Sequence, residues 1–236
     1  EVTKQTIAHM ALIQTEKLGK TYRSKAFDVD AVTDIDLHFK QGEFTAIVGP
    51  SGSGKTTLLN LLGGLDRPTT GRLLIDGKDI GLLKEKELVD FRLRNIGFVF
   101  QSYNLIPVFT VEENISFLME LQGRPKEEQK WRTHELLKVI GLADRARSRP
   151  ANLSGGEQQR VAVARALAAK PRFVLADEPT ANLDTKSAEN LLYMMMRLNK
   201  EENMTFIFST HDPRVMAKAN RIITLEDGRM IKEEFV

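Results

Sequence analysis

The sequence predicts an α/β fold with a mostly parallel sheet, an antiparallel β subdomain and an inserted helical subdomain. Short apolar, β-branched runs alternate with longer segments of helical spacing, a pattern typical of parallel sheets that are covered on both faces. One such run leads into a glycine-rich loop and then into a helix-forming segment. Residues 111–142, by contrast, contain no strand-like run, which indicates a helical insertion.

The composition is ordinary for a globular protein. The 236 residues are 42% hydrophobic and 28% charged, which suits one α/β domain at 11–236 after a polar extension at 1–10 that lacks the apolar core of a signal peptide. The net charge of +2 gives no argument for nucleic acid as a partner. The absence of cysteine excludes a disulfide framework and agrees with a cytoplasmic location. The longest charge-free run, 95–111, contains polar residues and a proline, so we expect no membrane-spanning helix.

The N-terminal part shows strand patterns on both sides of the glycine-rich loop. Two of them precede the loop and predict a small antiparallel sheet. A turn at Asp76-Gly77 lets the strand before it pair with the chain that follows, and 84–94 has the spacing of a surface helix. The strands expected here cover residues 11–22, 29–39, 44–48, 72–75 and 96–100.

The C-terminal part alternates helices and strands and ends in a hairpin over Asp227-Gly228. The helices are expected over 154–169, 184–199 and 213–219, and the strands over 173–176, 205–209, 221–225 and 229–232. Met194–Met196 on the second helix are expected to pack in the core. The apolar anchors expected in the helical insertion are Trp131, Leu136, Leu137 and Ile140.

The glycine-rich loop fits the pattern G-x-x-x-x-G-K-[ST] at Gly49, Gly54, Lys55 and Thr56. Its glycines let successive backbone N–H groups turn toward an anion, and the N-terminus of the following helix adds its positive end. Lys55 would then contact the β- and γ-phosphates, and the Thr56 hydroxyl would bind Mg²⁺. The alternative is a chance match, which the flanking strand and helix argue against. The loop therefore predicts nucleotide binding.

Two adjacent carboxylates, Asp177 and Glu178, follow the apolar strand at 173–176. Ligands collect at the carboxyl ends of strands in open α/β sheets, so Asp177 can hold Mg²⁺ through water. Glu178 can polarise an attacking water as a general base, a role worth roughly 10²–10⁴ in rate. The alternative is a pair of solvated acids, which the phosphate loop in the same chain makes the weaker interpretation.

Residues 153–157, LSGGE, begin the helix at 154–169. Ser154 and Glu157 have the spacing of a capping box. The box does not account for Gly155 and Gly156, which are poor helix formers in a first turn unless a ligand approaches the backbone closely. The segment is therefore a second candidate surface for phosphate.

In this order, the motifs resemble those of the ATP-binding-cassette (ABC) nucleotide-binding domains, and the resemblance covers nearly all of 11–236. GPSGSGKT at 49–56 is similar to the Walker A loop, LSGGE to the family signature, and FVLADE at 173–178 to the Walker B strand. The remaining similarities are Gln101 to the Q-loop glutamine, ANLD at 181–184 to the D-loop, His211 to the switch histidine, and Tyr22 to the aromatic residue that stacks on adenine.

The resemblance implies a P-loop NTPase core at 11–100 and 166–236, a helical subdomain at 101–165, and hydrolysis of ATP. Two copies would pair head to tail, with each ATP between one Walker A loop and the signature of the other copy. Glu178, His211 and Gln101 are the expected catalytic residues. The expected Mg²⁺ ligands are Thr56, Gln101 and Asp177. The expected nucleotide-binding residues are Tyr22, Gly49, Pro50, Ser51, Gly52, Ser53, Gly54, Lys55, Thr56, Thr57, Ser154, Gly155, Gly156 and Asp184.

Within the family, residues 101–114 and 176–184 resemble the branch that serves lipoprotein release, macrolide export and FtsE-like cell-division complexes. This implies an integral membrane permease as partner, with residues 103–109 as the floor of the groove for its coupling helix, and a location on the inner face of the cell membrane. The alternative is a regulatory or non-transport ABC ATPase in cell division, repair or translation. Repair members need a long coiled-coil insertion and translation members usually carry two cassettes, neither of which this chain shows.

Overall fold

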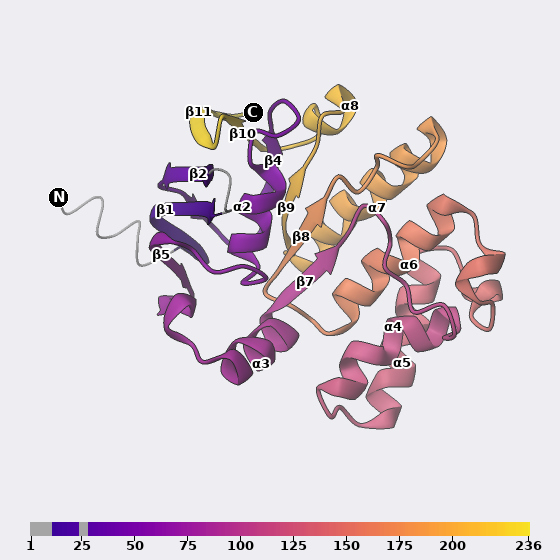
Figure 1. Ribbon diagram of the computed structural model, residues 1–236. Coiled ribbons are helices and arrows are strands. Elements are labelled where there is room, and N and C mark those ends of the chain that lie inside the picture. Colours follow the sequence, from indigo (N-terminus) through magenta and orange to yellow (C-terminus); the bar gives the residue numbers. More distant parts are fainter. Residues whose placement is uncertain (1–10, 24–27) are drawn as a thin grey trace. The chain divides into compact units, whose positions relative to one another are not determined.

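The computed structural model describes residues 11–23 and 28–236, so the extension predicted at 1–10 lies outside the described residues. The chain forms two compact units (Figure 1). The first unit contains the described residues up to Val89 together with Thr205–Val236, and the second contains Asp90–Met204. The subdomain boundaries expected at residues 100 and 165 stay a prediction.

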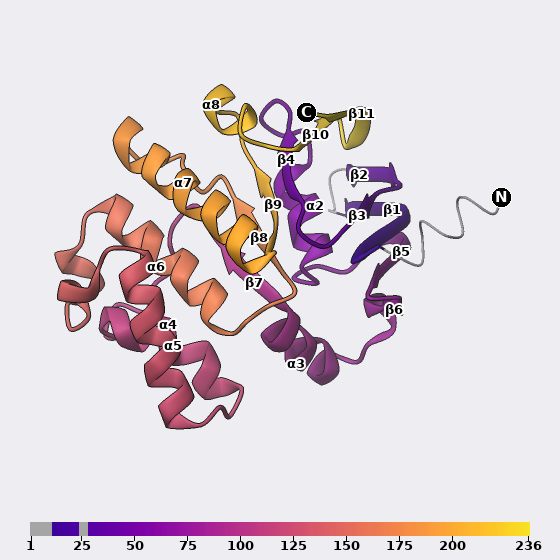
Figure 2. The same ribbon diagram turned by 180° about the vertical axis from the view of Figure 1, so that it is seen from behind.

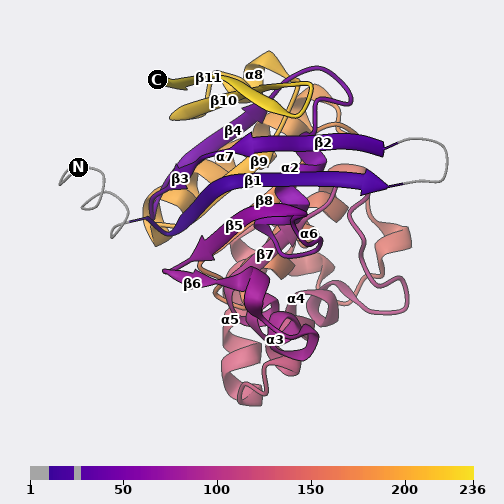
Figure 3. The same ribbon diagram turned by 60° about the vertical axis from the view of Figure 1, so that its left-hand side comes forward.

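An antiparallel sheet in the first unit is built around one long strand, which pairs with its neighbours on both sides (Figure 3). Its strands are β1 (Ile13–Arg23), β2 (Asp28–Ile35), β3 (His38–Phe39), β5 (Thr70–Ile75) and β6 (Lys78–Asp79). The strand predicted at 29–39 is thus divided in two. The buried hydroxyl of Thr15 explains the break, because it donates to the Ile35 carbonyl and accepts from the Leu37 amide, both at 2.8 Å.

The parallel strands of the first unit carry the phosphate loop. The fully buried β4 (Phe44–Val48) pairs in parallel with β9 (Thr205–Ser209) and β10 (Arg221–Glu226), and β10 forms the predicted hairpin with β11 (Arg229–Phe235). Two helices, α2 (Lys55–Leu62) and α8 (Pro213–Met216), follow β4 and β9. Phe44 packs against Phe206 and Phe208, with ring centroids 5.7 and 4.8 Å apart. These aromatic contacts stabilise β4 and β9. The phosphate loop follows β4, and His211 comes shortly after β9.

The chain passes from the first unit to the second through η1 (Ile80–Leu82) and the surface helix α3 (Glu85–Asn95), on which only Leu88 is buried.

The second unit is mainly helical and contains one parallel pair, β7 (Ile96–Val99) and β8 (Phe173–Asp177). Its helices are α4 (Val111–Leu121), α5 (Lys126–Val139), α6 (Gly155–Ala168) and α7 (Thr185–Glu202), with the short turns η2 (Ala143–Arg145) and η3 (Pro150–Asn152). Helix α6 packs against α4, α5, α7 and β7 (Figure 2). It is buried continuously from Val161 to Ala168. This helix is therefore the core of the unit.

One predicted core residue of the second unit is wrong. Trp131 is 59% exposed, whereas Leu136, Leu137 and Ile140 are buried as predicted. The inward positions on this side of α5 are taken by Arg132 and Thr133, polar residues that a search for apolar spacing passes over. Burial of Arg132 is made possible by its ion pair with Glu202, at 2.9 Å.

Helix α7 extends three residues beyond its predicted end. It stops at Asn203, which has the left-handed backbone that commonly ends helices (φ 51°). Met194 and Met195 are buried on this helix as predicted, whereas Met196 is only partly buried. Among the described residues, no helix is both long and apolar enough to cross a membrane.

Candidate functional site

The phosphate loop joins β4 to α2, as predicted. Gly49, Gly52 and Gly54 have φ of 149°, 81° and 98°, which a side chain adopts only with strain. A Cβ at Gly49 would lie 2.1 Å from the Leu225 carbonyl oxygen, and one at Gly54 would lie 2.3 Å from that of Ala31. At Gly52 no described atom lies within 4 Å of that position. Two glycines thus let the loop pack against its own chain, and the third leaves an open face.

Two side chains of the loop are suited to an anion. Lys55 is buried, and its Nζ donates to the carbonyl oxygens of Gly49 and Pro50, both at 2.9 Å, so the ammonium group is held across the loop. Ser53 is 2% exposed, and its hydroxyl has no hydrogen-bond partner among the described residues. Leaving such a group unsatisfied costs about 1–3 kcal/mol. A phosphate oxygen would satisfy it, so the loop fits the nucleotide that the sequence implies.

The N-terminus of α2 has no side-chain cap. Gly54 occupies the capping position, so the first amides of the helix receive no oxygen from a capping side chain. Thr56 in this first turn is exposed, which leaves its hydroxyl accessible to a ligand. The helix therefore offers donors and positive charge at the same place as Lys55.

Tyr22 is near the beginning of this helix. Its hydroxyl donates to Asp66 Oδ2 at 2.8 Å, and its ring is 42% exposed with the Lys20 ammonium 5.0 Å from the ring centroid. Burial and the hydrogen bond to Asp66 raise the pKa of Tyr22, while a hydrogen bond from Thr57 acts in the opposite direction. The ring is thus fixed by its hydroxyl end next to the phosphate-loop helix and keeps an exposed surface on which a base can stack.

His211 leaves the same sheet edge as the phosphate loop. Strands β4 and β9 are parallel with Ile47 opposite Ser209, and the Thr210 amide donates to the Ile47 carbonyl at 3.1 Å. His211 follows at once and is exposed. The next residue, Asp212, caps α8, and its hydrogen bonds with Arg214 lower its pKa. The first unit therefore brings Tyr22, residues 49–57 and His211 together.

The second unit places the acidic pair at the end of β8. Val99 pairs with Ala176, so the carboxyl ends of β7 and β8 adjoin. Gln101 comes after β7, and Asp177 is the last residue of β8 with Glu178 directly after it. Glu178 has a left-handed backbone (φ 44°), a conformation that costs energy for a non-glycine residue and is frequent at functional sites. The Asn182 side chain donates to the Gln101 carbonyl at 3.1 Å. The unit thus gathers the predicted catalytic residues Glu178 and Gln101, the predicted Mg²⁺ ligand Asp177 and residues 181–184.

The capping box predicted at the signature is confirmed. The Ser154 hydroxyl accepts from the Glu157 amide at 3.3 Å, and Glu157 Oε2 accepts from the Ser154 amide at 2.8 Å. The hydrogen bond from the Ser154 backbone lowers the pKa of Glu157. Ser154 itself is exposed at the helix start.

The two signature glycines have intramolecular contacts that the sequence did not reveal. A Cβ at Gly155 would lie 2.7 Å from the Tyr103 hydroxyl, and one at Gly156 would lie 2.7 Å from Ser187 Oγ. Ser187 is in the first turn of α7, where its amide donates to Asp184 at 3.0 Å. A side chain at either position would therefore have to displace its neighbour, Tyr103 or Ser187.

The Mg²⁺ ligands expected from the resemblance are divided between the units. Thr56 belongs to the first, and Gln101 and Asp177 belong to the second. A hydroxyl, an amide carbonyl and a carboxylate are the oxygen ligands that Mg²⁺ prefers, so the donor set fits the metal. No group of three or more acidic or histidine side chains that could hold a metal occurs in the described ranges.

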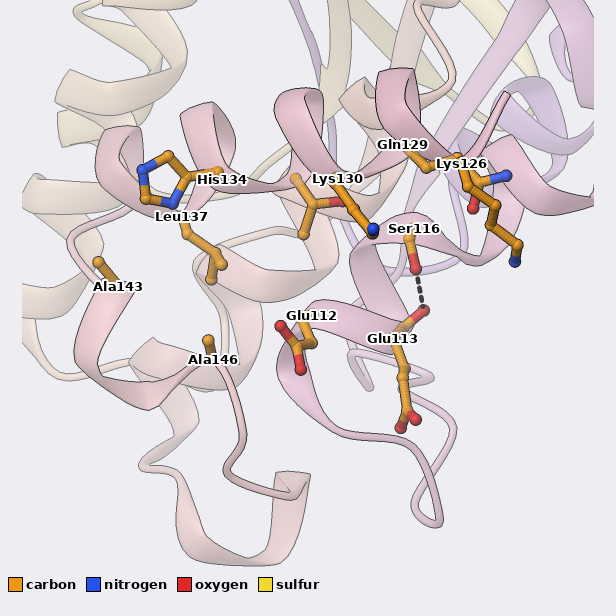
Figure 4. A pocket seen from close by; sticks show the side chains of 11 residues that line it. Glu112, Glu113, Ser116, Lys126, Gln129, Lys130, His134, Leu137, Ala143 and Ala146 are labelled. Atoms are coloured by element: carbon orange, nitrogen blue, oxygen red, sulfur yellow. Dashed lines mark hydrogen bonds between the residues drawn. The ribbon is translucent and has the colours of Figure 1, made fainter. Parts of the chain in front are cut away.

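A pocket of about 490 Å³ lies between α4 and α5 (Figure 4), and none of the predicted site residues lines it. Glu112 and Glu113 contribute acidic groups from α4, and Lys126, Lys130 and His134 contribute basic groups from α5. The other lining residues are Ser116, Gln129, Thr133, Leu137, Ala143 and Ala146.

Residues 32–181 match the ABC transporter family. The chain is 42% identical over 224 residues to LolD, the lipoprotein-releasing system ATP-binding protein of Idiomarina loihiensis. The match covers 95% of this chain and 98% of that protein. It is 43% identical over 227 residues to MacB, the macrolide export ATP-binding/permease protein of Brucella melitensis. That match covers 96% of this chain but 35% of MacB.

Among solved structures, the dimeric post-hydrolysis state of the ATP-binding cassette MJ0796, bound to ADP and Pi, superposes with a TM-score of 0.88. That protein is 41% identical, and the match covers 94% of this chain and 98% of the other. The fold class, the order of the motifs and these similarities agree, and together they show that the chain belongs to the ABC transporter family as an ATP-hydrolysing cassette.

Proposed function

We propose that this cassette works as a head-to-tail homodimer, in which Mg·ATP closes the dimer and hydrolysis reopens it. The observation that supports this proposal most is that two helices of the chain, α2 and α6, begin in glycine-rich segments of the kind that bind phosphate. Only the N-terminus of α2 has a lysine and an unsatisfied buried hydroxyl beside it. In the proposed dimer, Ser154, Gly155 and Gly156 of one copy cover the γ-phosphate that the phosphate loop of the other copy holds. The MJ0796 cassette is dimeric and bound to ADP and Pi, which supports the pairing of two copies.

In the proposed reaction, Glu178 accepts a proton from the attacking water, and His211 contacts the γ-phosphate and orients that water. Thr56, Gln101 and Asp177 would hold the Mg²⁺ ion, which would supply positive charge beside the phosphates. Tyr22 stacks on the adenine, and Asp184 lies beside the nucleotide at the start of α7. All of the chemistry is transfer of a phosphoryl group to water.

The partner that we propose is an integral membrane permease, which converts the cycle into export, lipoprotein release or related mechanical work. LolD and MacB, to which the chain is similar, carry these activities in their names. The coupling helix of the permease would dock on residues 103–109, where Val108 is 69% exposed. The cassette would then act at the cytoplasmic face of the membrane.

The assignment of Glu178 is tested by Glu178→Gln. We expect ATP to bind with nearly unchanged affinity, turnover to fall roughly 10²–10⁴-fold, and an ATP-bound dimer to accumulate in size-exclusion chromatography. Glu189→Gln, at an exposed position of α7, is the matched control and should turn over ATP as the unmodified protein does. Normal hydrolysis by Glu178→Gln would refute the general-base role.

A further inference from the structure

Residues 101–104, here called the Gln101 segment, have an unusual backbone. Tyr103 and Asn104 both adopt the left-handed region, with φ of 60° and 50°. This region is uncommon for non-glycine residues, and two in succession persist only where the surroundings hold them. The contacts of the segment should therefore show what fixes it.

Arg165 of α6 provides the main attachment. The residue is 9% exposed, and its guanidinium donates to the carbonyl oxygens of Asn104 at 2.5 Å and Tyr103 at 3.0 Å. The planar fork of arginine presents two donors in a fixed geometry, which matches two adjacent carbonyls. Burial lowers the pKa of Arg165, which reflects the cost of placing this charge in the core of the unit.

A second contact joins the segment to the beginning of the same helix. The Tyr103 hydroxyl lies against Gly155, where a Cβ would approach it to 2.7 Å. Gly155 and Arg165 are ten residues apart, or about 15 Å along the helix axis. An attachment at two such distant points fixes both the position and the direction of the segment relative to α6.

We propose that Arg165 and Tyr103 are positioning residues that make the Gln101 segment and the signature helix move as one body. The proposal rests on the function proposed above, in which Gln101 acts at one nucleotide and Ser154–Gly156 at the other. The proposal adds that Gln101 cannot move at its nucleotide without moving Ser154–Gly156 at the other nucleotide. Weakening the attachment misplaces Gln101 while Tyr22 and the phosphate loop stay intact, so it lowers kcat and leaves the affinity for ATP unchanged.

The attachment through Arg165 is tested with Arg165→Lys, which keeps the charge but replaces the fork by a single point donor. We expect kcat to fall about tenfold, as a small misplacement of a catalytic group can cause, with KM for ATP within about twofold. Arg132→Lys is the matched control, because Arg132 is a similarly buried arginine of the same unit that pairs with Glu202 instead. It should lower Tm without lowering kcat. If Arg165→Lys also changes only Tm, Arg165 is a packing residue and the proposal is wrong.

The contact at Gly155 is tested with a pair of substitutions. Gly155→Ala places a methyl group against the Tyr103 hydroxyl, and Tyr103→Phe removes that oxygen and leaves Cζ as the nearest ring atom, at 3.7 Å from the methyl position. We expect Gly155→Ala to lose most of its turnover and the double variant to regain most of it, relative to Tyr103→Phe alone. A double variant as inactive as Gly155→Ala would overturn the inferred contact but leave the composite site standing. Full activity of Gly155→Ala would count against both the contact with Tyr103 and the role of Gly155 in the composite site.

Discussion

Helices α2 and α6 both begin in glycine-rich segments that we propose to act on phosphate, yet they are built differently. The N-terminus of α2 has no side-chain cap, a buried serine hydroxyl without a partner, and a lysine held by loop carbonyls. The N-terminus of α6 is closed by a complete capping box, and its glycines pack on Tyr103 and Ser187. The first has a buried hydroxyl that a ligand would satisfy, whereas the second has a side-chain cap from its own chain. A phosphate-binding loop and a surface that covers a phosphate held elsewhere would differ in this way.

The largest effect that separates the two helices is expected from Ser154→Arg. A bulky cation at the start of α6 should abolish turnover while the affinity of ATP for the monomer stays nearly unchanged, as measured by nucleotide titration. Thr110→Arg is the matched control, because Thr110 caps α4 with the same kind of capping box. Both variants should lose about 1 kcal/mol of stability, but only Ser154→Arg should lose turnover. Equal loss of affinity and turnover in Ser154→Arg would argue against a site shared between two copies.

A smaller effect is expected from Lys55→Ala in the loop before α2. Removing a charged donor to the phosphates should weaken ATP binding about 10- to 100-fold, the equivalent of about 1.5–3 kcal/mol. Lys218→Ala, at an exposed position beyond α8, is the control. Isothermal titration with a non-hydrolysed ATP analogue measures the change. Unchanged affinity in Lys55→Ala would remove the main distinction drawn between the two helices.

Ser53→Ala sharpens the comparison further. The hydroxyl has no partner among the described residues, so its removal should leave the ligand-free protein as stable as before or slightly more stable. If the hydroxyl binds a phosphate oxygen, ATP affinity should fall about 2- to 10-fold, as expected for one neutral hydrogen bond. Thermal unfolding with and without ATP gives both quantities. A loss of stability without ATP would show that the hydroxyl has a structural role instead.

The smallest effect concerns the pH dependence of the capping box at α6. The pKa of Glu157 is lowered in the folded protein, so its stabilising effect is present above the usual glutamate pKa of about 4.3 and is lost as the pH falls through the folded value. Glu157→Gln keeps the box but cannot titrate. The difference in unfolding free energy between the two proteins should therefore shrink below about pH 4. A difference that is constant down to pH 2 would contradict the role of the Glu157 charge.

The α2 region could be predicted from the sequence because all of its parts are consecutive. The strand, the glycines, Lys55 and Thr56 lie within one short stretch, and their spacing determines their geometry. The surroundings of α6 could be predicted only in part. Its capping box is local and was found, but its glycines meet Tyr103 and Ser187, which are distant in sequence.

Buried polar residues account for the other differences. Arg165 interrupts the apolar run of α6, and a charged residue in such a run indicates a buried polar contact. Its partners, however, are backbone carbonyls about sixty positions away that no sequence pattern specifies. Arg132 and Thr133 likewise occupy inward positions on α5, and for that reason Trp131 was wrongly assigned to the core. Apolar spacing locates most helices, but it does not determine the rotation of a helix whose buried face is partly polar.

The exposed position of Trp131 makes this residue an intrinsic fluorescence probe. It is the only tryptophan in the sequence, and it lies on α5 with 59% of its surface exposed. An indole in water emits at longer wavelength than one covered by a protein surface, and it is quenched by dissolved iodide. Emission and quenching would therefore report, without any attached dye, when another molecule covers this face of α5.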